Sequence, residues 1–176
     1  MLRFRPKTIQ GVTYTLDHLE GFTFTLDTEG GKRRAVIVGF SCHCFTEDIR
    51  QEHTPDYYYV HGGEKRAFDL TRHALSKRLP EIIRALYGRT VYMSKEANYF
   101  LLRTIETTEL AGPYLVFFNV RRAKQKGVDV LMNVESAYLK PGMTDRASAI
   151  RFSTLIERTA TGKPVPRGPL QLIKRK

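Results

Sequence analysis

The chain of 176 residues is 41 % hydrophobic and 11 % aromatic, which suits one well-packed domain and argues against wholesale disorder. Its 29 Lys and Arg against 18 Asp and Glu give a net charge of +11, which favours a nucleic acid or another anionic partner; a basic surface that only keeps the protein soluble is the alternative. No stretch approaches the roughly 18 apolar residues of a membrane span, and no secretory signal opens the sequence, so we expect a cytoplasmic protein without a membrane partner.

The N-terminal quarter is predicted to be β-structure. Alternating apolar and polar residues predict strands at 11–16 and 22–27, and a long β-rich run follows at 34–45. A Thr-Glu-Gly-Gly turn separates the last two segments, so 22–45 is expected to form a β-hairpin. Residues 46–68 are mostly polar and rich in turn signals, which predicts a loop with room for one short strand.

Residues 69–87 carry apolar side chains at helical spacing and are predicted to be helical. Pro80 interrupts this segment because proline has no N–H to donate and disfavours helix in the residue before it. Two alternatives follow. Either the helix kinks at Pro80, or Pro80 opens a second helix that ends at Gly88.

Four strand segments are expected after the helix, separated by short turns, and short connections favour an antiparallel meander. The first lies at 90–93, extended or joined to 98–105, and the others lie at 113–121, 128–139 and 148–158. The predicted fold class is therefore α+β, with an N-terminal β-hairpin module, one helix and a roughly four-stranded antiparallel sheet. We expect one domain at 1–162, divided into a β module (1–45), a loop (46–68), a helix (69–88) and a sheet (89–158), followed by a basic, proline-containing tail (163–176).

The positive charge is distributed unevenly along the chain. Residues 65–89 carry seven basic and two acidic groups, residues 163–176 carry five and none, and residues 46–64 carry one and five. This pattern predicts a basic face on the helix and in the tail, unless the helical charges are only the solvated side of an amphipathic helix. The predicted nucleic-acid contacts are Lys65, Arg66, Arg72, Lys77, Arg78, Arg103, Arg122, Lys174, Arg175 and Lys176.

Polar residues at strand spacing predict a second candidate site on the sheet. Ser136 would share a face with Tyr138, and Arg151 with Ser153, because residues two apart in a strand point the same way. Such a face, together with a histidine that titrates near neutral pH, offers the base, acid and cation that metal-free RNA cleavage needs. Ordinary half-solvated strands show the same alternation. The candidate catalytic residues are His73, Arg121, Tyr138, Arg151 and Ser153.

Cys42 and Cys44 are separated by one residue, so in a strand they would point the same way, and a disulfide between them would be strained. We therefore expect reduced thiols. With His53 and His61 these cysteines are the zinc candidates, although a strand would send His43 to the opposite face. A buried thiol pair in the hairpin core is the alternative, and we expect no cofactor.

Residues 69–158 resemble the barnase–EndoU–colicin–RelE group of small ribonucleases in their layout of a helix followed by antiparallel strands. The segments that carry the resemblance are Arg72-His73 with Lys77, NYFLLRT (98–104), YLVFFNVRR (114–122), VESAYL (134–139) and IRFSTL (150–155). The resemblance implies a metal-independent endoribonuclease of toxin or phage type. In this interpretation His73 is a general acid or base, three arginines (Arg103, Arg121, Arg151) stabilise phosphate, and Tyr138 and Ser153 supply hydroxyls.

Two other functions stay open from the sequence. One is a nucleic-acid-binding or regulatory protein of a mobile element that has no catalytic activity. The other is a protein–protein adaptor whose basic tail binds an acidic partner. The first predicts salt-sensitive binding without turnover, and the second predicts no nucleic-acid binding at physiological salt.

Overall fold

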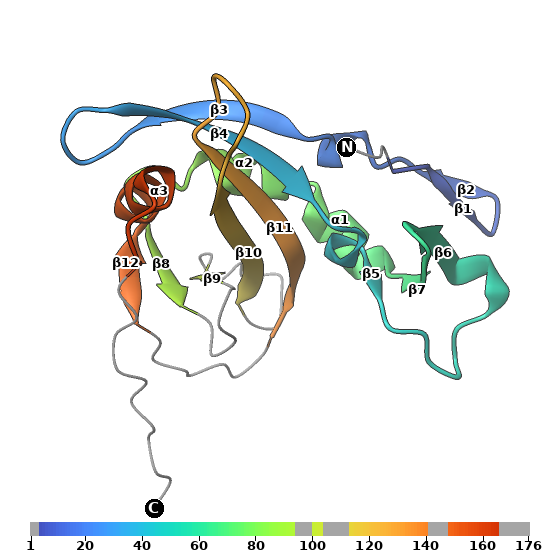
Figure 1. Ribbon diagram of the computed structural model, residues 1–176. Coiled ribbons are helices and arrows are strands. Elements are labelled where there is room, and N and C mark those ends of the chain that lie inside the picture. Colours follow the sequence, from blue (N-terminus) through green and yellow to red (C-terminus); the bar gives the residue numbers. More distant parts are fainter. Residues whose placement is uncertain (1–3, 94–99, 104–112, 141–147, 166–176) are drawn as a thin grey trace, which may run out of the picture.

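The computed structural model describes residues 4–93, 100–103, 113–140 and 148–165, and it confirms the α+β class (Figure 1). A seven-stranded sheet has the order β12-β8-β9-β10-β11-β4-β3, beside a three-stranded sheet (β5-β7-β6) and a small hairpin (β1-β2). The strands are β1 (Lys7–Ile9), β2 (Val12–Tyr14), β3 (Phe22–Asp27), β4 (Arg33–Phe40), β5 (Thr46–Glu47), β6 (Tyr58–His61), β7 (Glu64–Phe68), β8 (Thr90–Met93), β9 (Phe100–Arg103), β10 (Tyr114–Arg122), β11 (Val130–Leu139) and β12 (Ala149–Arg151). The helices are η1 (Asp17–Leu19), η2 (Cys42–Cys44), η3 (Pro55–Tyr57), α1 (Leu70–Ser76), α2 (Leu79–Arg84) and α3 (Phe152–Thr161).

The N-terminal hairpin is part of the main sheet and not a separate module. The sheet therefore has more strands than the four that the sequence predicts. β3 and β4 form the predicted antiparallel hairpin, but β4 also pairs in parallel with β11, from Val36 opposite Val130 to Phe40 opposite Val134. The apolar run of β4 from Ala35 to Phe40 is typical of an interior strand of a sheet, and β4 lies between β3 and β11. The result is one mixed sheet, which keeps the predicted antiparallel order of β8, β9, β10 and β11 and adds the hairpin beside β11.

Residues 46–68 are more ordered than the predicted loop with one short strand. β7 pairs with β5 on one side and with β6 on the other, and Gly62 and Gly63 close the β6–β7 hairpin with positive φ angles of 59° and 85°. Tyr59 and Phe68 are buried in the core, whereas Val60, Glu64 and Lys65 are exposed. The polar majority of these short strands concealed the alternation that marks a strand.

The break at Pro80 confirms the second of the two helical alternatives. α1 ends at Ser76, and α2 starts at Leu79 with Pro80 in its first turn, where proline's missing N–H costs nothing. The side chain of Asp69 caps α1 by accepting a hydrogen bond of 3.0 Å from the backbone N–H of Arg72.

The predicted strand at 148–158 is wrong over most of its length. Only Ala149–Arg151 is a strand, and α3 follows directly and ends at Gly162, which adopts a left-handed φ of 70°. The buried residues of α3 recur at helical spacing and pack on the same sheet face as the buried valines of β4, β10 and β11; they are Phe152, Leu155, Ile156 and Ala160. Ser153 therefore lies on a helix and does not share a strand face with Arg151.

Within the described ranges, no helix combines the length and the apolar character that a transmembrane span requires.

Candidate nucleic-acid interface

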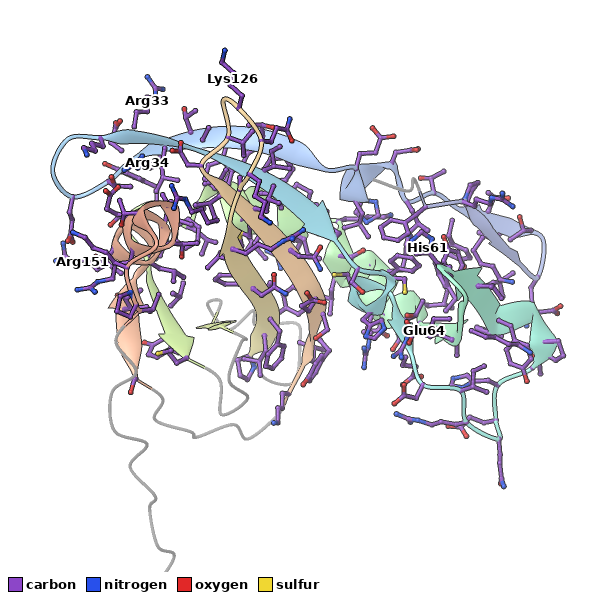
Figure 2. The ribbon with its side chains drawn as sticks, viewed as in Figure 1. Arg33, Arg34, His61, Glu64, Lys126 and Arg151 are labelled. Atoms are coloured by element: carbon purple, nitrogen blue, oxygen red, sulfur yellow. The ribbon has the colours of Figure 1, made fainter. Side chains whose placement is uncertain are left out.

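The parallel pairing of β4 with β11 places two basic turns side by side. One is the β3–β4 turn with its KRR run at 32–34, and the other is the β10–β11 connection with its RRAKQK run at 121–126. Asp129 joins them: its backbone N–H donates to the carbonyl of Ala35 at 2.9 Å, and its carboxylate accepts from the N–H of Ala35 at 2.8 Å. Figure 2 shows Arg33 and Lys126 at this same end of the sheet.

Six cations on these two turns are exposed, and we call them the basic end. Its members are Lys32, Arg33, Arg121, Arg122, Lys124 and Lys126. Among the residues that the structure describes, none of the six is in an ion pair; Arg33 donates only to the hydroxyl of Thr25, at 3.1 Å. Consecutive strand residues point to opposite faces, so Arg121 and Arg122 extend the positive charge to both faces of the sheet end.

A partly buried ion network fixes the two turns and removes Arg34 from the set of available cations. The guanidinium of Arg34 binds both oxygens of Glu157 at 2.8 and 2.9 Å and an oxygen of Asp129 at 3.0 Å. The hydroxyl of Thr28 donates to the same Glu157 carboxylate at 2.7 Å. Hydrogen bonds from Arg34 and then from Thr28 lower the pKa of Glu157 to about 2, and the hydrogen bonds with Glu157 and then with Asp129 raise the pKa of Arg34.

His73, the predicted acid or base, is a core residue with 4 % of its surface exposed. Its Nε2 lies 2.9 Å from the carbonyl of Thr15, so this nitrogen carries the proton that it donates. The ring packs against the rings of Tyr14, Phe68 and His18. Burial lowers the pKa of His73, with a smaller contribution from the charge of Lys77, so the imidazole is held neutral and away from any ligand in solvent.

The other predicted catalytic residues do not converge on one point. The ring of Tyr138 stacks on Phe117 with centroids 5.3 Å apart, and the guanidinium of Arg72 lies 5.1 Å above it. Arg121 is opposite Leu131, seven positions from Tyr138 along β11, a separation of about 20 Å at the rise of a strand. Arg151 lies on β12, three strands from β10 and about 14 Å across the sheet. Figure 2 shows Arg151 at that outer edge, beside α3, where Ser153 also lies.

The predicted basic face around α1 is partly occupied by contacts within the protein. Arg66 donates to Thr46, Asp48 and Glu64, and Arg72 donates to two backbone carbonyls and pairs with Asp69. Three predicted cations are exposed: Lys65 lies 4.1 Å above the ring of Tyr58, and Lys77 and Arg78 flank the junction of α1 and α2. The side chain of Arg103 and the tail residues Lys174, Arg175 and Lys176 lie outside the described residues.

The four zinc candidates do not form one cluster. The Cys44 thiol is fully buried and lies 3.6 Å from the carbonyl of Val134, His53 contacts Glu47 and the backbone of Arg50, and His61 packs against Phe4. The expected strand at 42–44 is wrong, because these residues form the 3-10 turn η2. Neither cysteine forms a disulfide, and burial raises the pKa of each thiol.

Four members of the basic end were not predicted from the sequence: Lys32, Arg33, Lys124 and Lys126. The sequence feature that could have identified them is the pair of basic runs at 32–34 and 121–126. Acidic residues elsewhere in 1–45 and 90–162 offset these runs when charge is summed over long segments. The sequence alone does not show that the fold places 32–34 beside 121–126, because residues 35–120 lie between them.

Comparison with known proteins gives a family and no characterised relative. No curated protein and no solved structure matched the chain. The model of the YjaZ family matches residues 6–160, which include the whole main sheet, both basic turns and nearly all of α3. The chain is therefore a member of the YjaZ family.

Proposed function

We propose that this protein binds nucleic acid, with RNA as the favoured partner, by placing the phosphate backbone against the basic end. The observation that carries this proposal is the pairing of β4 with β11, which joins two distant basic turns into one group of six exposed cations. Lys and Arg side chains that neutralise phosphates release condensed counterions, and this release supplies most of the affinity in sequence-independent binding.

The rigidity of the two turns supports the same proposal. The only arginine of the two runs that is neutralised, Arg34, ties β4 to α3 and to the start of β11 through Glu157 and Asp129. The free cations beside it are therefore held on a fixed scaffold. Such a scaffold lowers the entropy lost when several phosphates are bound together.

The geometry supports binding better than cleavage. A ribonuclease site needs an acid, a base and a cation around one phosphate. Here His73 is buried, and Arg121 lies about 20 Å from Tyr138 at the rise of a strand. RNA cleavage stays a prediction that rests on the resemblance to small ribonucleases, and the choice of RNA over DNA rests on that resemblance too. No described contact favours the adaptor alternative.

The test compares two variants that change the net charge equally. The first carries Arg33→Glu, Lys124→Glu and Lys126→Glu on the basic end. The second carries Lys65→Glu, Lys77→Glu and Arg78→Glu on the predicted α1 face; those three positions are also exposed. Fluorescence anisotropy of a short single-stranded RNA, titrated at several salt concentrations, measures affinity and salt slope for each.

The basic-end variant should bind at least about tenfold more weakly, and its salt slope should fall by about 2, since each single-strand phosphate contact contributes about 0.7. The α1-face variant should retain most of the affinity. An equal loss in both variants, or a loss in the second alone, would overturn the proposed location. In EDTA the RNA should stay intact, and cleavage by the wild-type protein would show that binding is only part of the function.

A further inference from the structure

Three side chains with metal-ligating atoms meet where η2 lies near the β6–β7 hairpin. The Cys42 sulfur, an imidazole nitrogen of His43 and a carboxylate oxygen of Glu64 all lie within 4.8 Å of one another. The Nε2 of His43 is 2.9 and 3.0 Å from the two oxygens of Glu64. No other such cluster occurs in the described ranges of the chain.

Two tight turns create this arrangement. η2 begins at Ser41, whose hydroxyl accepts a hydrogen bond from the N–H of His43 at 3.3 Å, and the hydroxyl of Thr46 holds the carbonyl of Cys42 at 2.8 Å. A strand would send the side chains of Cys42 and His43 to opposite faces, whereas the 3-10 turn lets both approach the same carboxylate. The Gly62-Gly63 turn then places Glu64 at the first position of β7.

We propose that this cluster is a Zn²⁺ site in which Cys42 Sγ, His43 Nε2 and a Glu64 carboxylate oxygen are the protein ligands. Thiolate, imidazole and carboxylate are the three ligand types that zinc takes in proteins, and three protein ligands leave the fourth tetrahedral position for water. The side chains of His43 and Glu64 are 36 % and 47 % exposed, so a hydrated ion reaches them from solvent. This site follows the end of β4 that is opposite the basic end (Figure 2), and the inference does not depend on RNA binding.

The present distances require only small movements. Zinc bonds of about 2.0–2.3 Å at tetrahedral angles place the ligand atoms about 3.3–3.7 Å apart. Ligand atoms that are now up to 4.8 Å apart must therefore approach by about 1 Å. The nitrogen of His43 and the oxygens of Glu64 must separate slightly, because they are now in direct hydrogen-bond contact.

The contact between Glu64 and Arg66 does not prevent metal binding. Arg66 Nη1 lies 3.1 Å from Glu64, but the same guanidinium also donates to Asp48 and to Thr46, each at 2.9 Å. Release of Glu64 therefore leaves Arg66 paired. The zinc in turn replaces the positive charge that Arg66 presents to the carboxylate. The metal would tie η2 to the β6–β7 hairpin.

The test uses the full chain, stripped of metal with a chelator and titrated with Co²⁺ as a spectroscopic probe and then with Zn²⁺. Binding of one ion per chain should produce a thiolate-to-cobalt charge-transfer band, and Zn²⁺ should displace it. Cys42→Ser should abolish the band. Glu64→Gln should weaken Zn²⁺ binding by more than about 100-fold, beyond the usual effect of losing an outer-shell partner. His53→Gln is the matched control and should bind as the wild type does.

Far-UV circular dichroism of the metal-free variants separates loss of a ligand from loss of fold. Glu64 is exposed, so Glu64→Gln should keep the wild-type spectrum, and its result decides the question if Cys42→Ser unfolds. Zn²⁺ should raise the melting temperature of the wild type and leave that of Glu64→Gln unchanged. No charge-transfer band in the wild type, a band that survives Cys42→Ser, or undiminished Zn²⁺ binding by Glu64→Gln would overturn the site.

Discussion

Replacing Glu157 with Gln removes the negative charge from the bidentate contact with Arg34 while it nearly preserves the shape of the side chain. The network lowers the pKa of Glu157 from 4.5 to about 2, which corresponds to about 3.4 kcal/mol of preference for the charged form in the folded state. Solvent reaches this carboxylate, whose side chain is 21 % exposed, and screens part of that energy. We therefore expect Glu157→Gln to lower the free energy of unfolding by about 1.5–2 kcal/mol at neutral pH.

The direction of the pH dependence follows from the lowered pKa of Glu157. A carboxyl whose pKa is lower in the folded state stabilises the protein fully above its unfolded pKa of 4.5, and this stabilisation is lost as the pH falls toward about 2. The difference between wild type and Glu157→Gln should therefore be largest at neutral pH and shrink below pH 4.5.

Urea denaturation followed by circular dichroism measures this difference, since the chain contains no Trp. Glu52→Gln, which breaks an exposed contact of 3.8 Å with Arg50, is the control and should change stability by less than about 0.5 kcal/mol. Equal stability of wild type and Glu157→Gln, or a difference that does not vary with pH, would refute the reasoning.

Three further predictions follow from buried or strained positions. His73→Ala should destabilise the fold by about 2–4 kcal/mol, because it leaves a cavity and orphans the carbonyl of Thr15; a folded, stable variant that loses an RNA-cleaving activity would instead support a catalytic His73. Burial, and then the neighbouring His73, lower the pKa of His18 to about 4, so the free energy of unfolding should fall as the pH decreases from about 6.5 to about 4; a flat urea-midpoint profile over this window would contradict it. Gly162→Ala should cost about 1 kcal/mol in a thermal melt, because a Cβ is strained at the left-handed φ that ends α3, and an unchanged melting temperature would argue against that geometry.

Local signals predicted local structure well. The Thr-Glu-Gly-Gly turn located the β3–β4 hairpin, Pro80 located the break between α1 and α2, and the turns around 113 and 140 located the two central strands. The segment at 148–158 failed because Phe152, Leu155 and Ile156 mix β-branched and aromatic residues that suit a strand or a buried helical stripe equally. The choice is decided by packing against the sheet, which a short window of sequence does not contain.

The features of the candidate site that were not predicted depend on contacts between segments that are distant in the sequence. The burial of His73 depends on rings from β2, β7 and η1, and the basic end depends on a parallel pairing between segments about 90 residues apart. Charge totals for consecutive segments predicted that phosphate is a suitable partner. They placed the charge on and just before α1, where Arg66 of β7 and Arg72 of α1 bind acidic and backbone groups of the protein itself.

The central claim is that the two basic turns are the surface that contacts nucleic acid. The most direct measurement is a titration of the ¹⁵N-labelled protein with a short single-stranded RNA at low salt, followed by two-dimensional amide NMR. We predict that the largest shift changes fall on residues 30–34 and 121–127, and that they diminish as salt is added. Shifts confined to the α1 face at 65–78, or none at saturating RNA, would contradict the claim.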